Sequence, residues 1–361
     1  MFLNHGSFGA CPKPVFEAYQ RWQLELERQP VEFLGRRVEG LLDVARTALA
    51  DYLHGAAENL VIVPNATSGV NIAARSIRLQ PGDEILTTDQ EYGACSYAWQ
   101  HNCERSGAKY VVRPMPLPMT TPEAFVEHFW QGVTPRTRVI YLSHITSPTA
   151  LIFPVEDICR RARKAGIISV IDGAHAPGQI PLDMERIGAD FYAATCHKWM
   201  CTPKGSGFLY VRPEHQWPIE PLIVSWGWTE GASFVTRNQR QGTRDPAAYL
   251  TVPTAIEWMK ANHWDEVRAR CHALGVELRQ QIDDWSDQPP VAPESWFSQM
   301  FSAVLPPCDA EVVKRRLYDD YRVEVPLTLV AGRQGVRVSL QAYNTREDGQ
   351  KLLAALKEIF V

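Results

Sequence analysis

IISVID at residues 167–172 and FYAATCHK at residues 191–198 are two short segments that stay almost wholly apolar until they reach an ionisable side chain. Apolar runs of this length, rich in β-branched and aromatic residues, are typical of strands buried in an α/β sheet. The first run ends in Asp172, and the second ends beside His197 and Lys198. The sequence therefore predicts two buried strands whose ends carry a carboxylate and an amine.

The same alternation of short apolar runs and helix-like segments extends over most of the chain. Further apolar runs stand at residues 60–63, 84–87, 110–113, 139–142 and 208–211, and helix-like segments stand at 15–28, 36–53, 67–77, 95–106, 122–131 and 155–165. Repeated βα units predict an α/β fold with a mostly parallel, seven-stranded sheet.

The alternation of short apolar runs and helix-like segments ends after Pro253. A long helical segment is predicted at 255–285, followed by strands at 298–305 and 335–340 and helices at 310–318 and 347–359. We therefore predict three parts: an N-terminal segment over the active site (1–14), a large domain (15–253) and a smaller α/β C-terminal domain (254–361).

The composition excludes several classes of protein. The chain of 361 residues has a net charge of −4, and its basic clusters fall on predicted helix faces, so no nucleic-acid partner is expected. Its apolar runs are too short for a membrane helix, and no secretory signal is visible, which predicts a cytoplasmic protein. Eight scattered cysteines without ligand spacing predict neither disulfides nor a metal site.

Polar residues that follow the apolar runs are the first candidates for a binding site, because open α/β sheets bind ligands beyond the carboxyl ends of their strands. The run at 60–63 leads into Asn65-Ala66-Thr67-Ser68-Gly69, where a helix N-terminus can either hold a phosphate or simply be capped. The run at 139–142 leads into a polar segment at 143–147, and Thr195 and His197 flank the amine of Lys198.

The pair of Asp172 and Lys198 fits the needs of a pyridoxal phosphate (PLP) enzyme. A buried carboxylate requires a cationic or donating partner, and the protonated pyridine nitrogen of PLP is such a partner. Asp172 could otherwise cap the next turn. A buried lysine with a lowered pKa can form the Schiff base and later serve as acid and base.

These residues together resemble a known family. The motifs are FLNHGSFG at 2–9, NATSG at 65–69, DGAH at 172–175, HK at 197–198, QGTRD at 241–245, and VRVS at 336–339 with Tyr343 and Asn344. The chain is similar to fold-type I PLP enzymes of the class V aminotransferase group, most of all to the isopenicillin N epimerase family.

The resemblance implies roles for individual residues around PLP. Lys198 would form the internal aldimine, and Asp172 would hold the pyridine nitrogen. The other residues predicted to bind the cofactor are Thr67, the backbone of Ser68, Thr195 and His197 around the phosphate, Tyr92 stacked on the ring, His175 at the phenolic oxygen, and Thr146 and Ser147.

Further residues are implied in substrate binding and assembly. Arg337 would grip the substrate α-carboxylate, and Asn4 and His5 would belong to the N-terminal segment that closes over the site. Gly242 and Thr243 match a segment that reaches the phosphate of the neighbouring subunit, which implies a homodimer with shared active sites.

The implied activity is chemistry at the α-carbon of an amino acid, by an epimerase or racemase or by an aminotransferase. The alternative is a C–S lyase or cysteine desulfurase type of elimination. A desulfurase needs a mobile cysteine, and Cys308 lacks the expected loop of small residues. Tyr92, His5 and Cys196 are conceivable acids on the second face of the substrate, although stacking, lid closure and core packing are their plainer roles. A nicotinamide enzyme is disfavoured because GxGxxG is absent after the first run.

Trp226 and Trp228 leave two alternatives open. They would line the pocket for the substrate side chain or pack a loop against the partner subunit.

A catalytically silent protein on the same fold is disfavoured, because the lysine, the aspartate and the arginine are all present.

Overall fold

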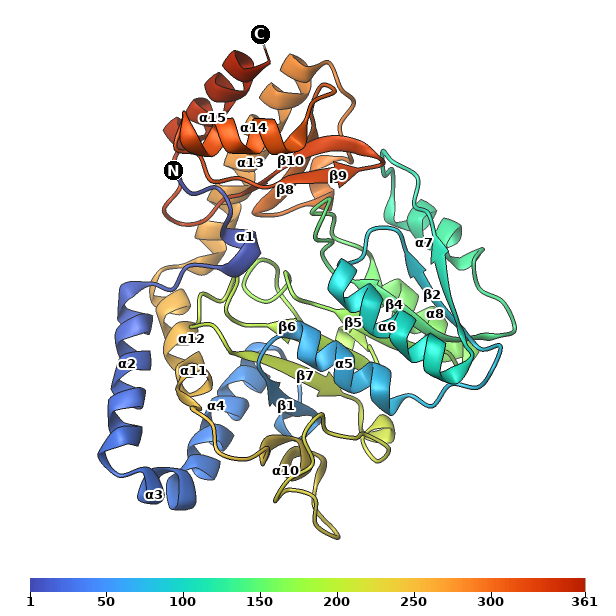
Figure 1. The fold of residues 1–361 in the computed structure, drawn as a ribbon, viewed down its shortest axis with the longest axis vertical. Coiled ribbons are helices and arrows are strands. Elements are labelled where there is room, and N and C mark those ends of the chain that lie inside the picture. The colour runs from blue at the N-terminus through green and yellow to red at the C-terminus, as the bar shows by residue number, and fades with distance from the viewer. Residues whose placement is uncertain (361) are drawn as a thin grey trace.

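A seven-stranded sheet forms the centre of the computed structural model, which describes residues 1–360 (Figure 1). The strand order is β1-β7-β6-β5-β4-β2-β3, and only β7 runs antiparallel to its neighbours. The mostly parallel sheet predicted from the sequence is therefore confirmed. The strands are β1 (Leu60–Val63), β2 (Glu84–Thr88), β3 (Lys109–Arg113), β4 (Thr137–Ser143), β5 (Ile168–Asp172), β6 (Phe191–Thr195) and β7 (Gly207–Val211).

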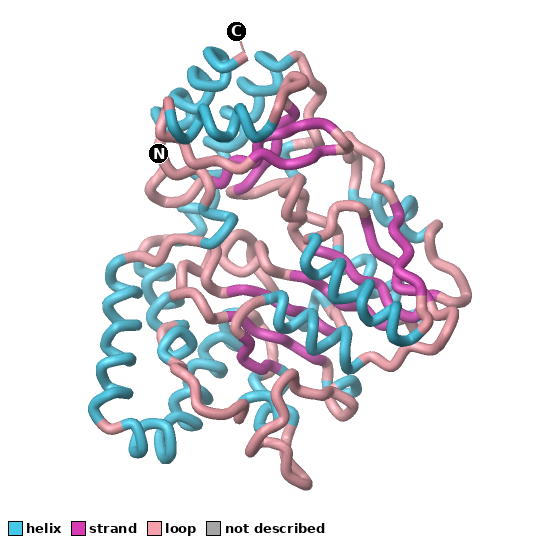
Figure 2. Tube along the Cα trace, in the orientation of Figure 1, coloured by secondary structure: helices cyan, strands magenta, loops and turns pink. Residues whose placement is uncertain are grey.

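Helices cover both faces of this sheet because successive strand residues point to opposite sides. Val61 and Tyr141 belong to a core with α5 (Ala66–Ser76) and α6 (Gly93–Ser106). Leu60 and Ile140 belong to a second core on the other face. The helices that contribute to this second core are α4 (Val38–Tyr52), α7 (Pro122–Trp130), α8 (Val155–Ala165) and α12 (Val252–Ala261). Figure 2 shows these helices as layers on either side of the strands.

A smaller antiparallel sheet in the order β8-β10-β9 lies above the large one (Figure 1). It contains β8 (Met300–Val304), β9 (Leu327–Val330) and β10 (Arg333–Ser339), and its helices are α13 (Trp264–Ser286), α14 (Ala310–Asp319) and α15 (Arg346–Ile359). β9 was not predicted. The domain limits at residues 14 and 253 stay a prediction.

The N-terminal segment crosses from the small sheet to the large one. Leu3 is fully buried in the core of the small sheet, and its backbone bonds to Glu324 and Ser339. The short helix α1 (His5–Phe8) then leads over the carboxyl ends of the large sheet. The remaining helices are α2 (Lys13–Arg28), α3 (Pro30–Glu32), a π-helical turn (Phe33–Arg37), α9 (Met184–Ile187), α10 (Phe234–Gln239) and α11 (Ala247–Leu250).

The prediction of a single long helix at 255–285 is wrong, because a turn at residues 262–263 separates α12 from α13. His263 has a left-handed backbone with φ of 50° at the break. This turn buries Trp264, whose indole donates to the carbonyl of Gly178 at 2.8 Å. Burial of a large aromatic ring outweighs the helical propensity of the segment.

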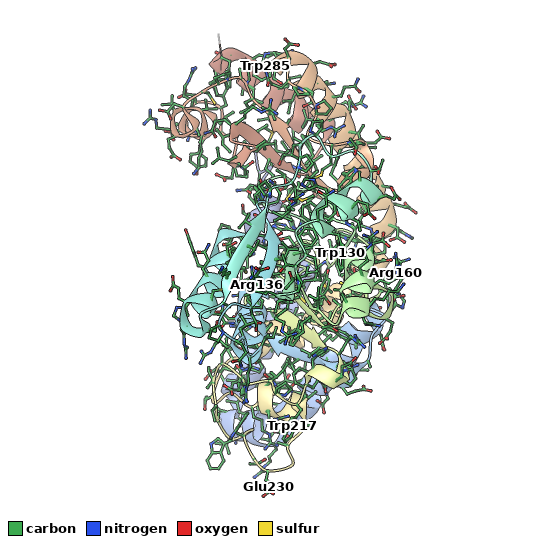
Figure 3. All side chains as sticks on the ribbon, turned by 90° about the vertical axis from the view of Figure 1, so that its right-hand side faces the viewer. Trp130, Arg136, Arg160, Trp217, Glu230 and Trp285 are labelled. Carbon is green, nitrogen blue, oxygen red and sulfur yellow. The ribbon has the colours of Figure 1, made fainter. Side chains whose placement is uncertain are left out.

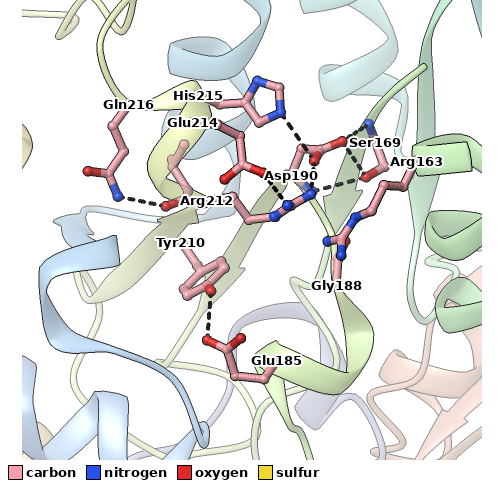
Figure 4. A network of polar contacts seen from close by, with 11 residues as sticks. Arg163, Ser169, Glu185, Gly188, Asp190, Tyr210, Arg212, Glu214, His215 and Gln216 are labelled. Atoms are coloured by element: carbon pink, nitrogen blue, oxygen red, sulfur yellow. Dashed lines mark hydrogen bonds and ion pairs between the residues drawn. The ribbon is translucent and has the colours of Figure 1, made fainter. Parts of the chain in front are cut away.

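Two other regions lie away from the strand ends that carry Asp172 and Lys198. At the edge of the sheet opposite the strand ends that carry Asp172 and Lys198, Asp190 accepts bonds from Ser169, Arg212 and His215 (Figure 4). The loop with Trp217 and Glu230 lies at the far end of the molecule from Trp285 (Figure 3). Across residues 1–360, no helix is both long and apolar enough to cross a membrane.

Candidate active site

A cavity of about 250 Å³ lies at the carboxyl ends of β1, β4, β5 and β6. Its walls combine strand ends with the N-terminal segment. The lining residues are Ser7, Phe8, Asn65, Ala66, Thr67, Tyr92, Ser143, Ile145, Ser147, Asp172, Ala174, His175, Thr195, His197 and Lys198. A larger cavity, of about 860 Å³, lies between α4, α12 and α13, but its charged side chains such as Asp51 and Lys260 are exposed to solvent. Buried ionisable groups therefore single out the smaller cavity.

Asp172 closes the bottom of this cavity at the end of β5. Its side chain is almost fully buried and accepts bonds from the backbone N–H of Ala174 at 2.9 Å and from the hydroxyl of Tyr141 at 3.3 Å. Burial raises the pKa of Asp172, and the charge of Lys198 works in the opposite direction. A carboxylate in this position has room for a cationic partner, as the protonated ring nitrogen of PLP would be.

Lys198 lies three residues beyond β6 and is the only lysine among residues 1–360 that lines the cavity. Burial, together with the positive charge of Arg337, lowers the pKa of Lys198 to about 8, although Asp172 acts in the opposite direction. Its Nζ lies 3.2 Å from Nε2 of His175. The amine is thus partly neutral near physiological pH, which is the form needed for attack on an aldehyde.

The N-terminus of α5 forms the wall near Thr195. The Asn65 side chain caps the helix by accepting from the backbone N–H of Ser68 at 2.9 Å, and the Ala66 N–H donates to Thr195 Oγ1 at 3.0 Å. Gly69 lets the helix approach β6, because a Cβ there would lie 2.7 Å from that of Ala193. The helix N-terminus and the hydroxyls of Thr67 and Thr195, which line the cavity, fit a phosphate.

His197 lies beside the same helix end. Its Nδ1 is 3.2 Å from the carbonyl oxygen of Ser206, so this nitrogen carries a proton and Nε2 is left for another partner. Burial lowers the pKa of His197 to about 4, and the positive charge of Lys198 contributes. A bound phosphate would supply the missing negative charge and favour protonation of Nε2.

Arg337, on β10 of the small sheet, is not itself among the residues that line the cavity, but it bonds to two residues that are. Its Nη1 donates to the carbonyl and hydroxyl of Ser147 at 2.7 and 3.1 Å, and Nη2 donates to Ser7 Oγ at 3.1 Å. The Nε atom is buried without a partner, and burial lowers the pKa of Arg337 to about 10. An incompletely satisfied, buried guanidinium fits a carboxylate ligand.

Several predicted residues lie outside the cavity wall. Thr146 is buried with its hydroxyl bonded to Thr149 and to the backbone of Leu151, so it has no free group to offer a cofactor. His5 lies beneath the cavity, bonded to Tyr343 and to the backbone of Lys198. Asn4 donates to Glu324 at 2.9 Å.

Three further predicted residues are also absent from the lining. Ser68 uses its backbone N–H and its hydroxyl on Asn65. Gly242 and Thr243 line a separate cavity of about 490 Å³ together with Trp226. Trp226 therefore does not line the pocket near Lys198.

Ser7 and Phe8 line the cavity and Glu91 bonds to the lining residue Ser143, and none of the three was assigned a role from the sequence. Ser7 joins the N-terminal segment to Arg337, since its hydroxyl also donates to Asn4 Oδ1 at 2.5 Å. The Glu91 carboxylate accepts from the backbone and hydroxyl of Ser143 at 2.7 and 2.6 Å. Burial raises the pKa of Glu91 to about 7. The position of Glu91 just before Tyr92, beyond a buried strand, was the available signal.

None of the residues that line the cavity is a cysteine. Cys196 is fully buried in the core on one face of the sheet, and burial raises its pKa to about 12. Cys308 packs partly buried against the core of the small sheet. Within residues 1–360 no cysteine therefore lines the cavity, although the Cys95 thiol contacts the carboxyl group of Asp172 from behind the wall.

Comparison with known proteins places these features in a family. The profile of the family "Aminotransferase class-V" matches residues 10–352. Isopenicillin N epimerase from Amycolatopsis lactamdurans is 34% identical over 99% of this chain and 94% of its own length. Putative L-cysteine desulfhydrase 1 from Oryza sativa subsp. japonica is 30% identical over 99% and 82% of the two chains. A solved structure of the lyase C-DES, with glycine covalently linked to its PLP cofactor, is 22% identical with a TM-score of 0.83 over 98% and 95% of the chains.

Proposed function

Because the chain belongs to the class V aminotransferase family and uses PLP, we propose that it removes and returns the α-proton of an amino acid, as an epimerase or racemase. The supporting observation is that a partly neutral lysine amine and a buried aspartate line the cavity but no cysteine does, and that Arg337 bonds to the lining residues Ser147 and Ser7. The similarity to isopenicillin N epimerase favours epimerisation over the transamination that the same residues would support.

The residues of the chain divide the work of holding PLP. We assign the ring nitrogen to Asp172, the phenolic oxygen to His175, the ring face to Tyr92, and the phosphate to Thr67, Thr195 and His197. Lys198 carries the cofactor. PLP, when bound, withdraws electrons from the α-carbon of the attached amino acid and so makes the α-proton acidic.

The substrate is held and deprotonated by two further groups. Arg337, fixed by Ser147 and Ser7, pairs with the α-carboxylate and so orients the α-carbon. Once Lys198 is released by the substrate, its amine accepts the α-proton, because burial keeps part of it neutral.

Epimerisation requires a proton donor on the second face of the substrate. Of the three candidates from the sequence, His5 and Cys196 lie outside the cavity wall, and both nitrogen atoms of His5 are engaged. Tyr92 lines the cavity and is about half exposed. We therefore assign the second-face proton to the hydroxyl of Tyr92, in addition to its stacking role.

A homodimer is part of the same proposal. Ile223, Val224, Trp226 and Trp228 are exposed on the loop that precedes α10, and Gly242 and Thr243 follow that helix. Exposed apolar side chains of this size are typical of an interface. A partner subunit on this surface would receive Gly242 and Thr243 at its own phosphate site. Light scattering of the purified protein tests this, and a monomer at micromolar concentration would contradict it.

Incubation with single amino acids in deuterated water tests the reaction. We expect deuterium at the α-carbon together with inversion of configuration. Formation of a keto acid with loss of the amino group would identify an aminotransferase. Release of sulfide and pyruvate from cysteine would identify the C–S lyase alternative, which the similarity to a putative L-cysteine desulfhydrase supports.

A further inference from the structure

The imidazole ring of His175 is held between two nitrogen atoms from the segment that follows β6. Trp199 Nε1 lies 3.2 Å from Nδ1 of His175, and Lys198 Nζ lies 3.2 Å from Nε2. An indole N–H can only donate, so Nδ1 has to accept through its lone pair. A neutral imidazole that accepts at Nδ1 carries its single proton on Nε2.

We propose that Trp199 is a positioning residue that fixes His175 in the tautomer protonated on Nε2, and thereby presents a donor to Lys198. An ammonium group has three N–H donors and no acceptor, so it makes no hydrogen bond with Nε2–H. A neutral amine has a lone pair and accepts this proton. The indole of Trp199 therefore selects the neutral form of Lys198 through the ring of His175.

The packing around Trp199 leaves its indole no alternative position. The side chain is fully buried, and the ring of His5 lies 5.2 Å from it. A Cβ at Gly6 would lie 3.3 Å from the indole ring, and one at Gly178 would lie 2.4 Å from the backbone carbonyl of Trp199. Glycine at these two positions allows the close approach that holds the indole against His175.

The backbone of His175 is fixed as well. The side chain of Gln179 donates to the His175 carbonyl at 2.8 Å. Both partners of the contact between Trp199 and His175 are thus set by neighbours that do not depend on a bound ligand.

Burial and the neighbouring positive charges favour the neutral forms of His175 and Lys198, as the tautomer does, whereas negative charges oppose the neutral form of Lys198. Burial lowers the pKa of His175, and the positive charges of Lys198 and Arg337 add to this, so the ring stays neutral. For Lys198, burial and Arg337 lower the pKa, whereas Asp172 and the thiol of Cys95 raise it. The N–H group on His175 Nε2 also favours the neutral amine of Lys198, because it can donate a hydrogen bond to the lone pair of that form only.

The same tautomer matters when the cofactor is present, and this consequence rests on the proposed function. Nε2–H is the donor that an anionic phenolic oxygen of PLP requires, and a ring protonated on Nδ1 would face that oxygen with a lone pair. Trp199 would thus prepare His175 for both the free lysine and the cofactor.

Nitrogen NMR of the full-length protein, labelled with ¹⁵N-histidine, tests the tautomer directly. His175 is assigned by comparison with His175→Gln, and spectra are recorded with and without added PLP. We expect Nδ1 to show the chemical shift of an unprotonated nitrogen and Nε2 that of an N–H group. The reverse pattern in the wild-type protein would overturn the proposal, and this holds even if variants of Trp199 fail to fold.

The effect on Lys198 is measured in the cofactor-free protein by its rate of acylation as a function of pH, read by mass spectrometry. Trp199→Phe removes the indole donor, so Nδ1 can carry the proton and Nε2 can accept from an ammonium. We expect the pKa of Lys198 to rise by about one unit, a tenfold shift in the protonation equilibrium. Trp296→Phe is the matched control, because it removes a buried indole that donates only to the carbonyl of Thr120.

An unchanged pKa in Trp199→Phe would contradict the coupling between the indole and the amine. A protein with the expected tautomer that does not attach PLP at Lys198 would instead contradict the proposed function. The two failures are therefore distinguishable.

Discussion

Arg337→Lys is the substitution that tests the substrate site most specifically. The wild-type guanidinium is held in one orientation by the carbonyl and hydroxyl of Ser147 and by Ser7 Oγ. A lysine keeps the positive charge but loses the planar fork, so it replaces a bidentate pair with the carboxylate by a single contact. One charge-assisted hydrogen bond contributes about 2 kcal/mol, which corresponds to a roughly 30-fold loss of affinity.

Titration of the cofactor absorption with an amino acid gives this affinity as a Kd without requiring turnover. We expect Kd to rise roughly 30-fold, because about 2 kcal/mol is lost. The matching amine without a carboxylate should bind both proteins equally. Arg333→Lys is the control, since Arg333 lies on the same strand but is exposed and bonds to Gln288. An equal loss of affinity for the amine, or no loss for the amino acid, would refute the assignment of Arg337 to the carboxylate.

Three further predictions concern other parts of the molecule. Tyr92→Phe should keep α-proton exchange into solvent but lose at least tenfold in the rate of inversion, because the ring still stacks while the hydroxyl is gone; equal losses in both rates by NMR and chiral chromatography would contradict its assigned role. Glu91→Gln should destabilise the protein by about 1–2 kcal/mol in urea unfolding, because Oε2 accepts from Ser143 and Oε1 accepts from Thr88, and an amide nitrogen in either place cannot accept; an unchanged free energy of unfolding would contradict a structural role for these bonds. Asp190→Ala should cost about 3 kcal/mol, because the N–H of Ser169 and the charge of Arg212 lose their buried partner, and a thermal shift below 2 °C would contradict it.

The loss in Asp190→Ala should depend on pH. Burial alone would raise the pKa of Asp190, but hydrogen bonds from His215 and Ser169 outweigh it and lower the pKa below the usual 3.8. A carboxylate with a lowered folded-state pKa stabilises the protein above the unfolded pKa, and this stabilisation is lost as pH falls through the folded one. The difference between variant and wild type should therefore be full at pH 7 and shrink below 3.8. An equal difference in stability at pH 7 and below pH 3.8 would show that lost packing, and not lost charge, destabilises the variant.

The sheet could be predicted because its strands are apolar on both faces and end in polar residues. Asp172 and Lys198 were found in this way, since an isolated charge after a buried run is rare without a partner. Contacts that depend on the return of a distant segment were not visible. Ser7 meets Arg337 across 330 positions of sequence, and the break at His263 follows from a contact between Trp264 and Gly178. Thr146 does not line the cavity, and sequence does not reveal that its hydroxyl is already used within its own turn.

We propose that Lys198 carries the cofactor in the cavity at the carboxyl ends of β1, β4, β5 and β6. Reduction of the purified protein with borohydride after incubation with PLP, followed by peptide mass spectrometry, measures this directly. We predict a pyridoxyl group on Lys198 alone and none after Lys198→Ala. Attachment to Lys204 or to any other lysine, or no attachment at all, would contradict the account.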